Sequence, residues 1–173
     1  VWAGIRKLPP GSALRVADAP AEPARYWQPG TVDLPEGRDG QIELVRSTLR
    51  QAVRERLVSD VPLGALLSGG VDSSIVVALM AAEAGDAGGI RTFTARFDDP
   101  RYDEGSHARA VAEHCGTDHT ELHVRPTPEG ILDDIIGRYD EPFADSSALP
   151  TFLVCQAARQ HVTVALAGDG GDE

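Results

Sequence analysis

The chain has few of the residues that mark several common kinds of site. Among its 173 residues there are two cysteines, Cys115 and Cys155, and no C-x-x-C spacing. Because both lie in apolar, helix-like surroundings, we expect buried free thiols in a reducing, cytoplasmic compartment, and neither a disulfide nor a zinc site. No apolar run approaches the length of a membrane span, so no membrane segment is expected.

Basic residues are also scarce. Lysine and arginine together number 16 against 27 aspartates and glutamates, which gives a formal net charge of −11. A nucleic-acid surface needs a basic stripe, so this balance argues against a nucleic-acid partner. Any polyphosphate ligand must therefore be held by local N–H groups, a metal ion and a few basic residues rather than by the overall field of the protein.

Two further catalytic or metal-binding patterns are missing. The sequence has no Gly-x-Ser-x-Gly nucleophile elbow. Its five histidines show no ligand spacing: His119 and His123 are four apart, but on an expected strand, which puts them on one face of a sheet and not at a helical i,i+4 site. We expect the histidines to be solvated or packed.

The first 39 residues differ from the rest of the chain. Prolines and glycines interrupt them at short intervals, and the alternating stretch 13–16 predicts a small β-hairpin. We interpret residues 1–39 as the end of a preceding domain plus a linker, and residues 40–173 as the first part of a truncated domain. Two interpretations, packing against a neighbouring domain or local support of the hairpin, stay open for three aromatic side chains: Trp2, Tyr26 and Trp27.

From residue 41 onward, helical and extended hydrophobic patterns alternate. The pattern predicts helices at 41–57, 73–84, 103–115, from Thr127-Pro128-Glu129 onward and at 149–160, and strands at 63–67, 90–97, 118–124 and 162–166. Such alternation predicts right-handed crossovers and a doubly wound, mainly parallel α/β sheet. Helix 73–84 is apolar almost all round, which predicts burial against a sheet.

Ligands of such sheets bind beyond the carboxyl ends of the strands. Three polar loops lie at such ends, at 68–74, 95–104 and 167–173. Asp103 or Ser106 is expected to cap the helix that follows the second loop, and Gly116 to end it.

The most informative loop is Ser68-Gly69-Gly70-Val71-Asp72-Ser73-Ser74, which lies between two apolar runs. Its glycines let the backbone turn and approach a ligand closely. The free N–H groups of the first helical turn favour an anion, and the three serines add hydroxyl donors. An acid belongs in such a site if a divalent cation lies between Asp72 and a polyphosphate.

This loop is not the common phosphate loop, because no lysine follows its glycines. It matches the pyrophosphate-binding loop S-G-G-x-D-S of enzymes that cleave ATP between its α and β phosphates. The alternative is a plain Gly/Ser turn between a strand and a helix. The aspartate, the paired serines and the flanking apolar runs argue against that alternative.

Two more polar segments are candidates. The loop 167–173 combines three acids with three glycines, which suits a second metal or phosphate site. Asp72 and Asp172 would then share a Mg²⁺ bound to the leaving pyrophosphate; the alternative is an acidic loop facing solvent. The segment 140–147 is expected to be a loop that either caps the next helix, through Ser146 or Ser147, or contacts substrate.

Several blocks in a fixed order resemble the glutamine-hydrolysing asparagine synthetase family. Residues 4–11 and 25–27 resemble the end of its N-terminal glutaminase domain, and residues 58–74 resemble the entry to its synthetase domain. Later family blocks follow in order at 92–93, 102–104, 140–145 and 168–173. The resemblance implies that 1–39 ends a glutaminase-type domain, and that 40–173 begins an ATP-binding synthetase domain with the Rossmann-like fold of the PP-loop ATP pyrophosphatases.

The resemblance also implies an activity. The family activates the β-carboxylate of aspartate with ATP to form β-aspartyl-AMP and pyrophosphate, and ammonia from glutamine then displaces AMP. ATP, aspartate and glutamine-derived ammonia are thus the implied substrates and Mg²⁺ the implied metal, while a homodimer of the full-length protein is left open. Metal and oriented N–H groups would relieve the repulsion between the attacking carboxylate and the α-phosphate, and would stabilise the departing pyrophosphate.

Roles carry over from the family motif by motif. Asp72 and Asp172 would bind Mg²⁺, and Asp169 together with Asp72 would be catalytic in the adenylate step. Leu67 and Ala95, at two strand ends, would touch the adenosine through backbone groups. The full set implied for nucleotide and pyrophosphate binding is Leu67, Ser68, Gly69, Gly70, Asp72, Ser73, Ser74, Ala95, Ala167 and Gly168.

Two positions depart from the family pattern. Ala167 stands where the family commonly has Ser, which removes a hydroxyl contact, and Asp169 is shorter than the Glu of some members. The glutaminase nucleophile and the second half of the synthetase domain lie outside this chain, so we expect activity of the full-length protein and at most weak nucleotide binding by the chain alone. Two alternatives stay open: a related amidotransferase acting on another carboxylate, and a nucleotide-binding module without turnover.

Overall fold

A computed structural model describes residues 3–16, 22–85, 89–101, 103–124, 128–139, 145 and 147–170. The chain divides into two compact units, Val1–Ile42 and Glu43–Glu173. This division lies close to the boundary expected after residue 39. The assignment of the first part to the end of a glutaminase-type domain stays a prediction.

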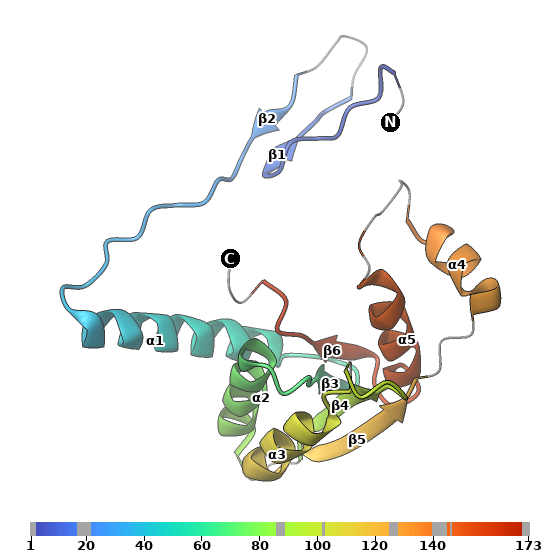
Figure 1. Ribbon diagram of the computed structural model, residues 1–173. Coiled ribbons are helices and arrows are strands. Elements are labelled where there is room, and N and C mark those ends of the chain that lie inside the picture. Colours follow the sequence, from blue (N-terminus) through green and yellow to red (C-terminus); the bar gives the residue numbers. More distant parts are fainter. Residues whose placement is uncertain are drawn as a thin grey trace. The chain divides into compact units, whose positions relative to one another are not determined.

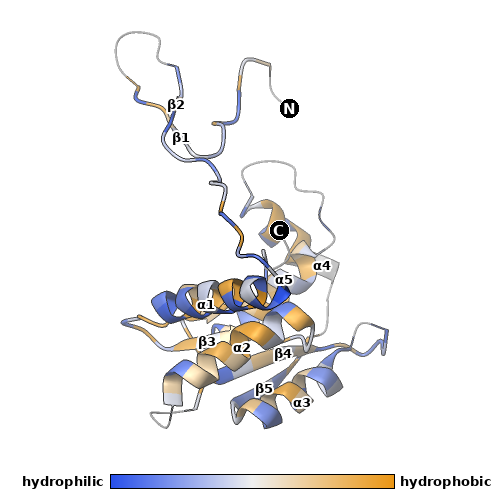
Figure 2. Cartoon of the chain, turned by 90° about the vertical axis from the view of Figure 1, so that its left-hand side faces the viewer, coloured by the Kyte–Doolittle hydropathy of each residue, from blue (hydrophilic) through white to orange (hydrophobic). Residues whose placement is uncertain are grey.

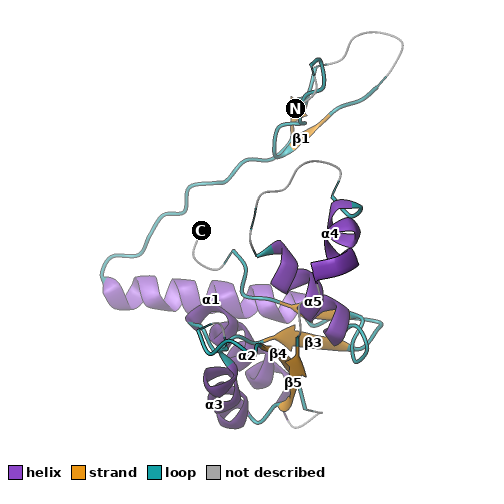
Figure 3. Cartoon of the chain, turned by 45° about the vertical axis from the view of Figure 1, so that its right-hand side comes forward, coloured by secondary structure: helices purple, strands orange, loops and turns teal. Residues whose placement is uncertain are grey.

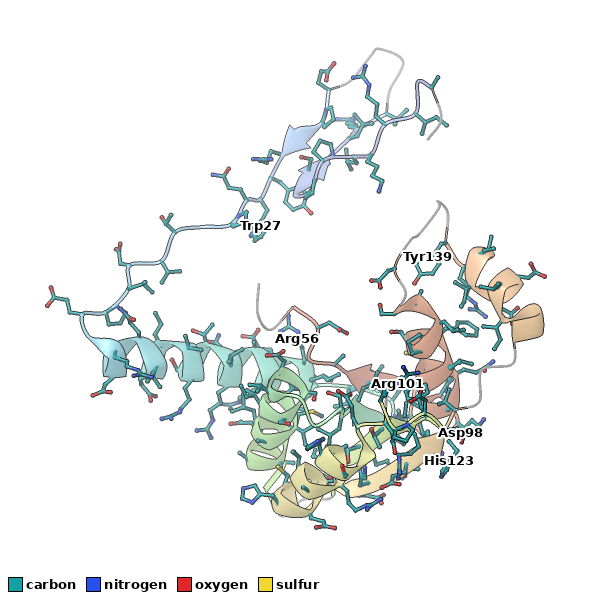
Figure 4. All side chains as sticks on the ribbon, viewed as in Figure 1. Trp27, Arg56, Asp98, Arg101, His123 and Tyr139 are labelled. Carbon is teal, nitrogen blue, oxygen red and sulfur yellow. The ribbon has the colours of Figure 1, made fainter. Side chains whose placement is uncertain are left out.

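The first unit contains a short antiparallel ribbon. In it β1 (Ser12–Ala13) pairs with β2 (Ala24–Arg25), so the expected hairpin is present but only two residues long. The Gly11 carbonyl accepts hydrogen bonds from the N–H groups of Tyr26 at 2.8 Å and Trp27 at 3.1 Å. These bonds fix the chain that leaves β2, where Figure 4 shows Trp27.

The aromatic side chains of this unit keep both of their interpretations. Tyr26 and Trp27 are largely exposed, at 76% and 59%. Trp2 lies outside the described residues. Whether these side chains support the ribbon or face a neighbouring domain stays a prediction.

The second unit is built on a parallel sheet. Its strands are β3 (Leu63–Leu66), β4 (Arg91–Arg96), β5 (Asp118–His123) and β6 (Val164–Leu166). They lie in the order β5-β4-β3-β6, and every pairing between them is parallel. Figure 3 shows these strands between helices on either side. The doubly wound, parallel α/β fold expected from the sequence is confirmed.

The helices of the described segments follow the expected order. Two of them, α2 and α3, cover one face of the sheet, and α5 covers the other (Figure 1). The bounds are α1 (Arg38–Arg56), α2 (Val71–Ala84), α3 (Gly105–Cys115), α4 (Pro128–Ile136) and α5 (Ala148–Ala158). None of the described helices is long and apolar enough to cross a membrane.

Apolar clusters fill both faces of the sheet because side chains alternate along each strand. Ala65 of β3 and Leu67, the residue after this strand, join the cluster on the α1, α2 and α3 side, and Leu66 packs against the cluster on the α5 side. The first cluster consists of Val53, Ala65, Leu67, Val77, Met80, Ala108 and Ala112, and the second of Phe93, Leu122, Ala158 and Val162. The ends of β3 are therefore held from both sides.

α2 packs against the sheet, as its apolar sequence predicts, through one side of the helix. Its buried positions are Ser73, Val77 and Met80, whereas Val71 and Ile75 are 73% and 39% exposed. Figure 2 shows most of the helix in the colours of hydrophobic residues. The buried positions are spaced by three or four residues, so the sheet and the neighbouring helices cover a single stripe of the helix.

The local helix signals have different outcomes: Gly116 is confirmed as the end of α3, whereas the N-cap of α3 is Glu104, with no side-chain cap bond among the described residues. The Asp103 carboxylate accepts the N–H of Gly105 at 3.3 Å, and Gly116 ends α3 in the left-handed conformation, with φ 64°. At the start of α5, however, Ser147 makes no capping bond through its side chain within the described residues. Instead the Asp145 carboxylate accepts the Ser147 N–H at 2.8 Å. Ser146 lies outside the described residues.

The cysteines differ from each other in exposure. Both thiols are free in the described structure; Cys115 is half-buried, and burial raises its pKa. Cys155 is exposed, so the expectation of two buried thiols is wrong for this residue. The apolar sequence around Cys155 reflects the opposite side of α5, where Leu153 and Ala158 are buried.

A polar cluster is packed under α3 at the start of β4 and β5. The hydroxyl of the fully buried Thr92 lies 2.8 Å from Thr117 Oγ1 and 2.9 Å from His119 Nδ1. The other ring nitrogen, His119 Nε2, is buried and has no hydrogen-bond partner among the described residues. Desolvation lowers the pKa of His119, and the opposing charge of Glu121 does not cancel it. His119 is thus a packed histidine.

We predict that His119 makes the folded protein less stable in acid. Its folded-state pKa lies below the ordinary value of 6.5, so the unfolded chain binds the proton more tightly. The contribution of His119 to the free energy of unfolding is fully present above pH 6.5, and it is lost as the pH falls toward the folded-state pKa. Urea unfolding measured in steps from about pH 7.5 to about pH 5 should show this decline, and His119→Gln should reduce it. An identical decline in the two proteins would contradict the assignment.

Candidate functional site

The strand order creates a switch point between β3 and β6. The chain runs outward from β3 through β4 to β5, and then returns to the other side of β3 as β6. At such a point successive connections leave the sheet on opposite faces, which opens a crevice beyond the carboxyl ends of the two strands. The loops 68–74 and 167–173 follow these two strands. The second loop is described as far as Gly170.

Two serines shape the loop 68–74. Ser68 Oγ and Ser73 Oγ lie 2.9 Å apart, and Ser68 Oγ accepts the Gly70 N–H at 3.1 Å. Ser73 Oγ also accepts the Ser68 N–H at 3.3 Å and donates to the Gly70 carbonyl at 3.3 Å. The sequence suggested these hydroxyls as ligand donors, and the structure gives them a second task, which is to hold the turn in shape.

The third serine of the motif is different. Ser74 Oγ is buried and has no hydrogen-bond partner in the part of the chain that the structure describes. Buried hydroxyls are nearly always paired in folded proteins. An unpaired hydroxyl in the first turns of α2 is consistent with a missing polar ligand.

The start of α2 has the form of an anion site. Its N-cap is Gly70, and no side chain within the described residues caps it. Because no described side chain caps them, the N–H groups of the first turn are available to a ligand, and the helix dipole favours negative charge there. Asp72 lies in this first turn and is exposed.

Gly168 brings the loop after β6 against this helix start. A Cβ atom at position 168 would lie 2.6 Å from the nitrogen of Ser73 and 2.9 Å from the carbonyl carbon of Asp72. Only glycine permits such a close approach of two backbones. The structure thus brings two of the predicted site segments, 72–73 and 168, into direct contact.

Asp169 follows at an exposed position beside α5. Burial raises the pKa of the Cys155 thiol, and the negative charge of Asp169 raises it further. This electrostatic effect requires the two groups to be near each other. Asp169 therefore lies on the α5 side of the loop that follows β6.

A cavity of about 280 Å³ occupies the crevice. Seven of the predicted site residues line it: Leu67, Ser68, Ser73, Ala95, Ala167, Gly168 and Asp169. Sequence reasoning did not assign the remaining lining residues, which are Leu66, Phe93, Thr94, Phe97, Glu104, Pro150, Thr151 and Val154. Pro150, Thr151 and Val154 share one face of α5, a helical spacing that the sequence contains, but nothing in the sequence says which face meets the sheet.

Some of the predicted site residues do not line the cavity, and others lie outside the described residues. Gly69, Gly70, Asp72 and Ser74 belong to the loop or to the start of α2 but do not line the cavity. Asp172 lies outside the described residues, so its pairing with Asp72 around a metal stays a prediction. Among the described residues, no group of three or more histidines, cysteines and acids could hold a metal ion. Of the segment 140–147, only Asp145 and Ser147 are described.

The family model for asparagine synthase matches residues 44–173 of the chain. A Methanocaldococcus jannaschii protein provisionally named asparagine synthetase (glutamine-hydrolyzing) 2 is 43% identical over 133 residues, which are 76% of this chain and 25% of that protein. Asparagine synthetase (glutamine-hydrolyzing) 1 of Bacillus subtilis is 31% identical over 173 residues, 99% of this chain and 27% of that protein. The chain thus spans about a quarter of the length of these relatives.

A solved structure shows a weaker similarity. The NH3-dependent NAD synthetase of Campylobacter jejuni, in complex with the nitrate ion, aligns with 71% of this chain and 54% of its own, with 14% sequence identity and a TM-score of 0.46. A likeness of this degree supports no inference about ligand or activity.

We predict that Gly69→Ala destabilises the protein more than Gly116→Ala. Both glycines have positive φ, 84° and 64°, so each substitution adds backbone strain of about 1 kcal/mol. A Cβ atom at position 69 would also lie 2.6 Å from the backbone of His107 and Ala108, whereas position 116 opens into free space. The extra loss should be roughly 1–3 kcal/mol in chemical denaturation. Equal losses would show that α3 does not press on the loop.

Proposed function

Because the chain belongs to the asparagine synthase family, we propose that the full-length protein is an ATP-dependent, amide-forming ligase of the glutamine-hydrolysing asparagine synthetase type. In this proposal, ATP activates the β-carboxylate of aspartate to β-aspartyl-AMP with release of pyrophosphate, and glutamine-derived ammonia then gives asparagine. The observation that carries the proposal is the contact of Gly168 with the uncapped start of α2, at a cavity beyond the carboxyl ends of β3 and β4.

The donors at the start of α2 fit a pyrophosphate group. First-turn N–H groups and the unpaired hydroxyl of Ser74 offer hydrogen bonds, and Gly69 and Gly70 put no bulky side chain in the way. Ser68 and Ser73 hold the turn in one conformation before any ligand arrives. Such preorganised donors stabilise the negative charge that grows on a departing pyrophosphate.

The cavity fits a nucleoside beside that group. Its volume of about 280 Å³ is close to the lower end of the range for small-molecule sites. Leu66, Phe93 and Val154 give it apolar walls, and the backbone at Leu67 and Ala95 lies at two strand ends where it can meet an adenosine. Ala167 and Gly168 close the side next to the pyrophosphate site.

Charge balance in this site depends on the backbone and on a metal ion. The described residues that line the cavity include Glu104 and Asp169 but no lysine or arginine. A triphosphate would therefore be repelled unless N–H groups and a divalent cation neutralise it. We assign Asp72 and Asp172 to Mg²⁺, which when bound neutralises phosphate oxygens, and Asp169 to the adenylate step.

We predict that Asp72→Asn in the full-length protein lowers aspartate-dependent pyrophosphate release by roughly a hundredfold or more, because the neutral amide holds the cation poorly. Release is measured with a coupled pyrophosphate assay in the presence of ATP and Mg²⁺. Asp118→Asn is the matched control: Asp118 is an exposed aspartate that opens β5 at the opposite end of the sheet, and this variant should keep wild-type release.

The same assay separates the alternatives. Wild-type release in Asp72→Asn would disprove the metal role. Faster release with another carboxylate in place of aspartate would identify an amidotransferase with a different acceptor. ATP binding without release, whatever carboxylate is added, would identify a nucleotide-binding module without turnover.

A further inference from the structure

The side chain of Arg96 links three elements next to the candidate site. Arg96 is the last residue of β4, and its guanidinium donates to both carboxylate oxygens of Asp103, at 2.6 and 2.8 Å. It also pairs with Glu121 of β5, and Glu121 in turn accepts from Arg109 Nε of α3 at 2.8 Å. All three members of the central group, Arg96, Asp103 and Glu121, are about four-fifths shielded from water. A two-pronged pair of this kind fixes direction as well as distance.

Arg96 also lies across the first residue of α3. Gly105 is buried, and a Cβ atom at this position would overlap Cδ and Nε of Arg96. The guanidinium is not free to move aside, because two acids hold it. Glycine at the start of α3 is therefore a spatial requirement of the Arg96 clamp, which we define as Arg96, Asp103, Glu121 and Gly105.

Residues next to the Arg96 clamp meet the candidate site at two places, the cavity wall and the loop 68–74. Phe97 follows Arg96 in the sequence, Glu104 follows Asp103, and both line the cavity. The Glu104 carbonyl accepts the N–H groups of His107 at 3.0 Å and Ala108 at 3.1 Å, and the backbone of these two residues is what leaves no room for a side chain at Gly69. Glu104 thus lines the cavity and also accepts hydrogen bonds from the two residues that support the loop 68–74.

Arg96 itself is not placed to bind phosphate. It does not line the cavity, and its donors are directed at carboxylates. The Arg96 hydrogen bonds hold the pKa of Asp103 below its ordinary range. Partial burial raises the pKa of Glu121, but the bonds from Arg109 and Arg96 outweigh it and leave that pKa lowered. The clamp stays ionised at neutral pH. Figure 4 shows the neighbouring Asp98, Arg101 and His123 at the same end of β4 and β5.

We propose that Arg96 is a positioning residue for the nucleotide site: by clamping the start of α3, it holds the loop 68–74 and the cavity-lining residues Phe97 and Glu104 in the arrangement that accepts ATP. The ATP half of this inference rests on the proposed function. The structural half, that the clamp holds the loop, stands on the contacts alone.

Two single variants and their combination test the clamp in the full-length protein. Arg96→Ala removes the guanidinium. Gly105→Ala keeps every charge, but its added methyl group displaces the guanidinium of Arg96. Each should speed amide hydrogen exchange in residues 68–74 by about tenfold, leave the second half of α2 unchanged, and raise KM for ATP by about tenfold, since small misplacements of binding groups are costly. The double variant should be no worse than Arg96→Ala, because the methyl group added at position 105 then displaces nothing.

Arg50→Ala is the matched control. Arg50 also forms an interhelix ion pair, with Glu83, but between α1 and α2 and away from the cavity lining. This variant should change neither the exchange of residues 68–74 nor KM for ATP.

Each outcome decides one half of the inference. A lower melting temperature with unchanged exchange in 68–74 would make the clamp merely structural and overturn the proposal. Faster exchange with an unchanged KM would overturn the link to ATP. If the wild-type protein releases no pyrophosphate, the proposed function fails along with that link, while faster exchange confined to 68–74 would still support the structural half.

Discussion

The close approach of Gly168 to the first turn of α2 is the contact on which the candidate site depends. It follows from strand register: Leu63 pairs with Val164, and Ala65 with Leu166. Leu67 and Gly168 come two residues after the paired Ala65 and Leu166, so the chain passes the ends of β3 and β6 at the same level. A side chain at position 168 would meet the backbone of Asp72 and Ser73 and would force the two loops apart. Without this contact, the start of α2 and the cavity would be separate features.

The core makes that register firm. β3 is short and carries small residues, and a Cβ atom at Gly64 would lie 2.8 Å from the ring of Phe93 and 3.2 Å from Val162. Its neighbours Ala65 and Leu67 are almost completely buried on the opposite face. Close packing on both sides leaves the strand little freedom to slide, because a slip of one residue would send each side chain to the wrong face. Rigid strand ends are what a preorganised binding loop requires.

The sequence predicted the parts of the molecule that depend on local pattern. Short apolar runs between glycines and prolines located the strands, and the S-G-G-x-D-S spacing located the loop at the switch point. It could not predict that Ser68 and Ser73 bond to each other, or that Asp145 accepts the N–H of Ser147 before α5, because each of these choices depends on how the chain folds back. The Arg96–Glu121 pair joins positions 25 residues apart on two strands, and such a pairing leaves no periodic signal.

The two departures from the family pattern affect the cavity more than the anion site. Ala167 and Asp169 both line the cavity, whereas the contact with α2 is made by Gly168 between them. In the proposed function, the absence of a hydroxyl at 167 would cost one hydrogen bond to the nucleoside, an effect of about 1 kcal/mol. A shorter acid at 169 moves a carboxylate but does not alter the N–H groups at the start of α2. In the proposed function, these substitutions therefore affect the cavity, and the ability to hold a pyrophosphate remains with the loop 68–74.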